Sequence, residues 1–110
     1  MTPRKILILG SGFLTDAGLY SLLSHLNHVE VIAAKFTTIK DLIWTIDAFR
    51  PHILVLVDEA LIEIAPAILS LIRGDSIVRT IIIHWEENEI EVYDRNRIEI
   101  KELNDFLAII

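Results

Sequence analysis

The sequence contains no cysteine among its 110 residues. Disulfides, zinc sites built on thiolates and cysteine nucleophiles are therefore excluded. The absence of cysteine also fits a reducing compartment, and we expect a cytoplasmic protein.

Long apolar runs are missing as well. The amino-terminal stretch MTPRKILILG has only four consecutive apolar residues before Gly10, too few for the core of a secretory signal. No run approaches the roughly 18 apolar residues of a membrane span. We therefore expect neither a signal peptide nor a membrane segment.

Positive charge is scarce. Ten Lys and Arg residues face 16 acids, and the net charge is −6. From Glu86 to Asp105 there are eight acids and three bases, a local balance of 3 − 8 = −5. Such a surface repels phosphate backbones, so we expect no nucleic-acid binding by this domain. The acidic run is also typical of a solvated face that only aids solubility.

The apolar content is high, with 53% hydrophobic residues and a mean hydropathy of +0.50. A chain of this length and composition buries one core without metal or disulfide staples. We find no repeat, low-complexity tract or linker. Residues 1–110 are therefore predicted to form a single ordered domain.

Four short runs rich in β-branched residues are typical of strands buried on both faces. They are residues 6–9, 29–34, 53–57 and 78–83. The first intervening segment has a helical stripe. Its predicted buried face consists of Leu14, Ala17, Gly18, Leu22 and Leu26, widened by Leu19 and Leu23.

The second helical segment begins with Thr38 and Asp41 at capping-box spacing and ends before Arg50-Pro51. Its predicted apolar face consists of Leu42, Ile43, Ile46 and Phe49. A third has Pro66 in its first turn and Gly74 as a C-cap, with Ile68, Leu69 and Ile72 inside. Strands alternating with helices predict a parallel sheet wrapped on both faces.

After His84 the pattern changes. NEIEVYDRNRIEIK, residues 88–101, alternates apolar and polar residues around the turn-like DRNR, which predicts a β-hairpin at the sheet edge. The chain closes with LNDFLAII, a predicted short helix. Its residues expected to pack on the sheet are Leu103, Phe106, Leu107 and Ile110.

Ligands of parallel sheets bind at the carboxyl ends of the strands. These ends are predicted at Gly10-Ser11-Gly12, Lys35-Phe36, Asp58-Glu59 and His84-Trp85. A dinucleotide fingerprint fails because Thr15 replaces its third glycine, and no P-loop lysine follows. A small nucleotide-binding domain using residues 10–12 stays open. We expect no metal at His84, Asp58 and Glu59, and His52 lies at the opposite end of its strand.

Four stretches form a series along the chain: GLYSLL (18–23), FRPHILVLVD (49–58), VRTIIIHW (78–85) and IEIKELNDFLAII (98–110). This series resembles response-regulator receiver domains of the NarL/LuxR type, over nearly the whole chain except residues 85–97. The resemblance implies an α/β, three-layer α-β-α fold. Its sheet would be flavodoxin-like or receiver-like and mostly parallel, with the carboxy-terminal antiparallel hairpin in place of the fourth helix.

The functional positions of receivers are only partly matched. The acid pair that holds Mg²⁺ in the family falls on Gly10 and Ser11, which supply no carboxylate. The phospho-acceptor falls on Val57, with Asp58 one residue later and so on the other face of a strand. The hydroxyl position falls on His84.

Only Lys101 matches the family residue. We therefore expect a pseudo-receiver of two-component signalling that works by protein contact, without catalysis, cofactor or metal. A phosphorylatable receiver using Asp58 is the alternative. The expected partner is another protein or a second copy. The expected homodimer surface is on the hairpin, at Ile90, Val92, Tyr93, Ile98 and Ile100.

Overall fold

The computed structural model describes residues 3–10, 14–57, 79–94 and 97–110, together with the single residues 63, 66, 67 and 70. Ser11, Asp58 and most of the predicted third helix lie outside these residues. The side chains of residues 14–17 and 97 are not described either.

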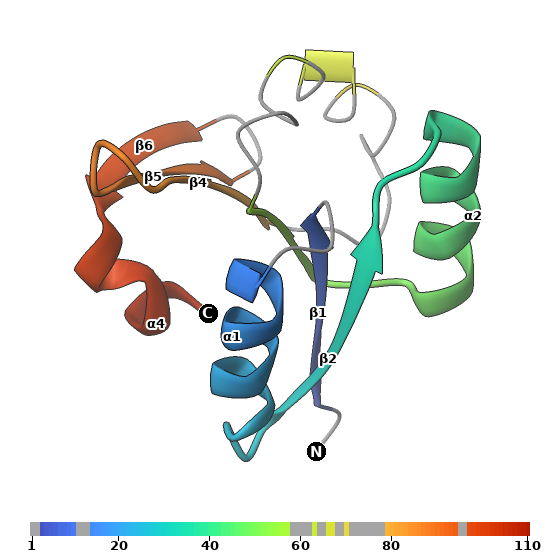
Figure 1. Ribbon diagram of the computed structural model, residues 1–110, viewed down its shortest axis with the longest axis horizontal. Helices are drawn as coiled ribbons and strands as arrows, with labels where there is room; N and C mark the ends of the chain where they lie inside the picture. Colours follow the sequence, from blue (N-terminus) through green and yellow to red (C-terminus); the bar gives the residue numbers. More distant parts are fainter. Residues whose placement is uncertain are drawn as a thin grey trace.

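One mixed sheet of six strands organises the described chain (Figure 1). The strands are β1 (Arg4–Gly10), β2 (Val29–Lys35), β3 (Ile53–Leu56), β4 (Arg79–His84), β5 (Glu89–Asp94) and β6 (Arg97–Glu102). Their order is β2-β1-β3-β4-β5-β6. The first four are parallel, whereas β5 is antiparallel to both of its neighbours. The predicted parallel strands and the predicted hairpin are therefore confirmed.

Helices pack on both faces of this sheet. They are α1 (Leu14–Ser24), α2 (Ile39–Phe49), the 3-10 turn η2 (Leu103–Asp105) and α4 (Phe106–Ile109). Figure 1 shows α1 and α4 on one side and α2 on the other. None of the helices in the described part of the chain is long and apolar enough to cross a membrane.

The core divides into two clusters because side chains of a strand alternate between faces. On the α1 and α4 face, Ile6 and Ile8 of β1 pack with Leu23 and Phe106. On the α2 face, Leu7 and Leu9 pack with the helix. The central strands are buried on both faces, which is why they read as continuous apolar runs.

The helix α2 begins and ends as its sequence predicts. Thr38 is the N-cap, and its hydroxyl accepts the Asp41 N–H at 3.1 Å. At the other end Arg50 adopts a left-handed conformation with φ 53°, and its N–H donates to the Ile46 carbonyl. Pro51 follows and cannot continue the helix. Leu42 and Ile46 are buried, Phe49 is half-buried, and Ile43 is exposed.

The predicted buried stripe of α1 was wrong in its phase. Leu19 and Leu23 are buried, whereas Leu22 and Gly18 are exposed. The predicted stripe therefore has to be rotated, and the residues thought to widen it form its centre. Leu26 contacts the core cluster in either phase.

The carboxy-terminal helix packs through one side. Phe106 is buried, and Leu103 and Ile110 contact the core, as predicted. Leu107 was predicted to pack on the sheet but is exposed, because it follows Phe106 directly and a step of one residue turns a helical side chain by about 100°.

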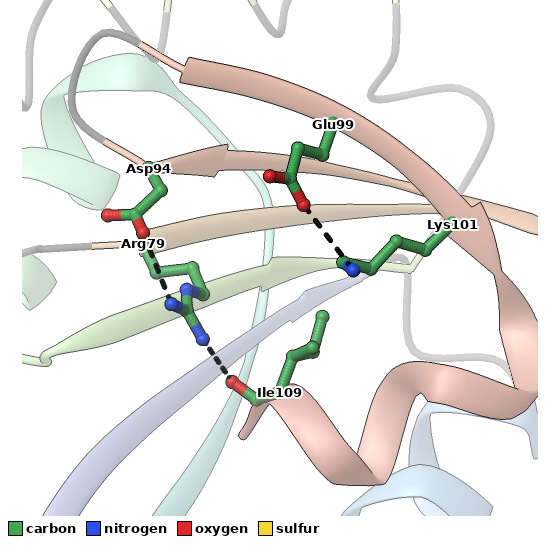
Figure 2. Close-up of polar contacts among 5 residues, drawn as sticks. All are labelled: Arg79, Asp94, Glu99, Lys101 and Ile109. Carbon is green, nitrogen blue, oxygen red and sulfur yellow. Dashed lines mark hydrogen bonds and ion pairs between the residues drawn. The ribbon is translucent and has the colours of Figure 1, made fainter.

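A single arginine ties this helix to the sheet. The Arg79 guanidinium donates to the Ile109 carbonyl and also pairs with the Asp94 carboxylate at 3.2 Å (Figure 2). It thereby joins the start of β4, the end of β5 and the last turn of the chain. Arginine suits this role because its fork carries several N–H donors.

Candidate functional site

The carboxyl end of β1 is closed by backbone hydrogen bonds. The Gly10 carbonyl accepts the Phe36 N–H at 2.9 Å, and the Val57 N–H donates to the Leu9 carbonyl at 3.1 Å. Gly10 itself is buried. The ends of β1, β2 and β3 are thus held together at the edge where ligands bind in parallel sheets.

Val57, on which the resemblance placed the receiver acceptor, is a core residue. Its side chain is 2% exposed and packs in the same cluster as Val55 of β3 and Ile81 of β4. Side chains alternate along the strand, so Val57 continues the inward face of β3. Asp58, the next residue, lies outside the described residues.

An indole spans the ends of β3 and β4. Trp85 follows β4 directly, and its Nε1–H donates to the Val57 carbonyl at 2.8 Å. The bond supplies a side-chain donor to the carbonyl at the end of β3. Sequence analysis assigned Trp85 no role. The only available signal was its position immediately after a strand, where a large polar-tipped aromatic can reach across to the neighbouring strand end.

His84, on which the resemblance placed the receiver hydroxyl, belongs to a chain of polar side chains. Its Nε2 lies 2.6 Å from Glu91 Oε1, and the Tyr93 hydroxyl donates to Glu91 Oε2 at 2.6 Å. Strand register explains the contact, because Glu91 pairs with Ile82 and is therefore diagonal to His84. The chain lies on the same face of the sheet as Ile82.

The pKa of Tyr93 is raised to about 12, mainly because its hydroxyl donates to the Glu91 carboxylate, and further by the burial of Tyr93 and the negative charge of Glu91. Because the folded value lies above the ordinary 10, the stabilisation is complete below pH 10 and is lost as the pH rises through about 12.

We expect Glu91→Gln to bring the Tyr93 pKa back toward its ordinary value. Tyrosinate absorbance measures this cleanly in a Tyr20→Phe background, since the chain has only two tyrosines. An unchanged titration in Glu91→Gln would contradict the assigned cause. The protein with Tyr20→Phe alone is the matched control.

Lys101 does not reach the strand ends at which a receiver lysine acts. It lies on β6 opposite Ile90, and β4 and β5 separate it from β3. Three strand spacings amount to about 14 Å. Its ammonium pairs instead with Glu99 at 3.4 Å (Figure 2). Lys101 therefore does not lie where the resemblance implied.

The predicted interface residues divide into two groups. Ile90 and Val92 are buried in the core and Tyr93 is half-buried, because β5 is an inner strand. The first two are therefore not available at the surface. Ile98 and Ile100 are 63% and 67% exposed on the edge strand β6.

His52 lies just before β3, away from this site, as predicted. Its Nδ1 accepts the Lys5 N–H at 3.0 Å. No cluster of three or more histidine and acidic side chains is placed to hold a metal ion within the part of the chain that the structure describes.

The described strand ends offer little for phosphoryl transfer. Gly10 and Val57 carry no polar side-chain group, and the imidazole of His84 is bonded to Glu91. A hard divalent cation requires oxygen ligands, usually carboxylates.

Comparison with protein-family models, curated proteins and solved structures gives no significant match.

Proposed function

We propose that this chain is an atypical receiver-like signalling module that acts through protein contacts and not through Mg²⁺-dependent phosphorylation of an aspartate. In this proposal the four parallel strands correspond to the first four strands of a flavodoxin-like receiver, with helices in layers on both faces. The hairpin β5–β6 takes the place of the fourth helix. We place the module in the cytoplasm, as a domain without enzymatic activity.

The observation that carries the proposal is the apolar filling of the acceptor position. Val57 is buried, and its carbonyl is bonded to the Trp85 indole. In a receiver this position would carry the phosphoryl group beside Mg²⁺ held by carboxylates, which neutralises the transferring oxygens. Gly10 supplies no carboxylate to hold Mg²⁺, the ion that phosphoryl transfer to an aspartate requires.

Phosphorylation from a small donor tests the proposal. Incubating the protein with acetyl phosphate and Mg²⁺ and measuring its intact mass should show no phosphoryl addition. A receiver of ordinary competence treated in parallel is the positive control. A mass gain that disappears in Asp58→Asn would overturn the proposal in favour of a phosphorylatable receiver.

A nucleotide panel tests the remaining alternative. If residues 10–12 bound a nucleotide, the ligand would raise the melting temperature by mass action. We expect no stabilisation by any member of the panel. A concentration-dependent shift would favour a nucleotide-binding domain.

The contact surface is proposed on the carboxy-terminal hairpin, with a second copy of the chain as the partner. The exposed isoleucines of β6 lie beside acidic and basic side chains, which limit nonspecific pairing. A dimer in light scattering at micromolar concentration supports this placement.

A further inference from the structure

The strand β6 has an open edge. It ends the sheet order, so no strand within the described residues pairs with its outer side. In an antiparallel ladder the hydrogen-bonding groups of a strand alternate in direction, and every second residue of β6 directs its N–H and C=O away from β5. Such an edge pairs with another strand unless the sequence prevents it.

The two faces of β6 differ in chemistry. Ile98 and Ile100 project from one face and are mostly exposed. Glu99 and Lys101 project from the other face, where their side chains form an ion pair and are 38% and 35% exposed. Figure 2 shows this pair on the same side of the sheet as Ile109.

We infer that a second copy of this chain adds to β6 in antiparallel orientation, with Ile100 directly opposite Ile100 of the second copy. This inference rests on the proposed function, because it specifies the partner and the mode of contact. The two copies then form one continuous sheet. A two-fold axis perpendicular to this sheet relates them.

The charges of β6 complement themselves in this register. Residues that meet across a two-fold axis have numbers that sum to twice the central residue, here 200. Glu99 therefore meets Lys101 of the second copy, and the axis repeats the pair. Opposite charges placed directly across strands stabilise the pairing, and like charges oppose it.

The apolar face agrees with the same register. The two Ile100 side chains meet at the axis, and each Ile98 lies diagonal to Ile100 of the second copy. Four exposed isoleucines thus bury one another, which removes apolar surface from water. Ile98 also lies opposite Glu102, whose aliphatic stem covers it.

Neighbouring registers are less favourable. Centring on Glu99 would oppose two glutamates at the axis. Centring on Lys101 would oppose two lysines. Centring on Ile98 would leave Ile100 without a residue of β6 opposite it, because β6 begins at Arg97, and so would shorten the pairing. Only the Ile100 register joins unlike charges and apolar residues along the strand.

The opposite edge of the sheet lacks this property. Glu30 and Lys35 are the charged residues of β2, and their positions differ by an odd number, so their side chains project from opposite faces. They cannot meet across a two-fold axis perpendicular to the sheet. Self-pairing is therefore assigned to β6 and not to β2.

Single cysteines test the register directly, since the chain has none of its own. Ile100→Cys should form a disulfide-linked dimer under mild oxidation, because directly opposite Cα atoms lie within bridging distance. Ile98→Cys is the matched control, as its position is equally exposed but lies about 13 Å along the strand from its own copy. Equal cross-linking at both positions would overturn the register.

Charge reversal tests the same pairs without cross-linking. Glu99→Lys and Lys101→Glu should each raise the dimer dissociation constant roughly tenfold or more, because both symmetric pairs become repulsive. Mixing the two variants should restore a heterodimer to within about threefold of the native affinity. The mixed pair contains no repaired chain, so the recovery reports contacts between copies alone.

The possible failures are distinguishable. A chain that stays monomeric to high micromolar concentration in sedimentation equilibrium overturns this inference, and an absence of phosphoryl addition then still supports a module that binds another protein. A dimer insensitive to both charge reversals also overturns it and assigns the contact to another face. Phosphoryl addition at Asp58 overturns the proposed function, whatever the oligomeric state.

Discussion

Val57→Asp should unfold the protein or come close to it. The substitution places a carboxylate at a position that is 2% exposed and surrounded by Val55, Ile81 and other apolar residues. An uncompensated buried charge costs about 3–5 kcal/mol, a large part of the stability of a small domain. Urea denaturation followed by circular dichroism measures the loss. The same substitution would be harmless if the side chain at position 57 were exposed to solvent.

Val57→Thr is the matched control, since threonine has nearly the shape of valine and carries no charge. We expect it to cost about 1–3 kcal/mol for an imperfectly paired hydroxyl. The two variants should also differ in pH dependence. Burial raises the pKa of the introduced carboxyl above its unfolded value. The penalty of Val57→Asp is therefore smallest at acidic pH, where the carboxyl is neutral and costs at least as much as the unpaired hydroxyl of Val57→Thr, and it grows as the pH rises, whereas that of Val57→Thr stays constant.

Phe106→Ala should cost about 3–5 kcal/mol. This ring is 5% exposed and is the buried anchor of the last helix, in contact with the core cluster under β5. The helix has four residues, too few to be stable without tertiary packing. Loss of the ring should therefore release the carboxy terminus together with the bond from Arg79. Chemical denaturation gives the energy, and amide exchange of Phe106 to Ile109 gives the local release.

Leu107→Ala provides the comparison on the same helix. Its side chain is 47% exposed, and the substitution should cost less than about 1 kcal/mol. A large loss from Leu107→Ala with a small loss from Phe106→Ala would show that the helix packs through its other side.

The parallel strands could be predicted because burial on both faces leaves continuous apolar runs, as in Ile53–Leu56 of β3. The hairpin could be predicted equally well, since alternating apolar and polar residues indicate strands with one buried face. The phase of α1 was not legible. The seven positions of the predicted stripe, from Leu14 to Leu26, span about 240° at 100° per residue, and composition alone does not decide which part faces the sheet.

The site depends on contacts that are distant in sequence, and these were missed. Trp85 donates a hydrogen bond to Val57 across 28 residues of sequence, and the residues around either position do not indicate this contact. Lys101 was matched to a family position from its surroundings in sequence. In the structure β5 lies between β4 and β6, so Lys101 is at the sheet edge. Strand order is a global property, so a local motif cannot reveal such a displacement.

The order in which the sheet is completed has a consequence for synthesis. The parallel pairing of β1 with β3 joins residues 47 apart, such as Ile6 and Ile53, and must wait for long loops to close. The hairpin closes locally and quickly, but its residues follow β4 along the chain and leave the ribosome after it. Until Glu89 emerges, the isoleucine-rich edge of β4 has no strand to cover it. Nascent chains stalled before that point would be prone to aggregate, because the edge of β4 is unpaired. Pairing with β5 covers this edge and removes the hazard.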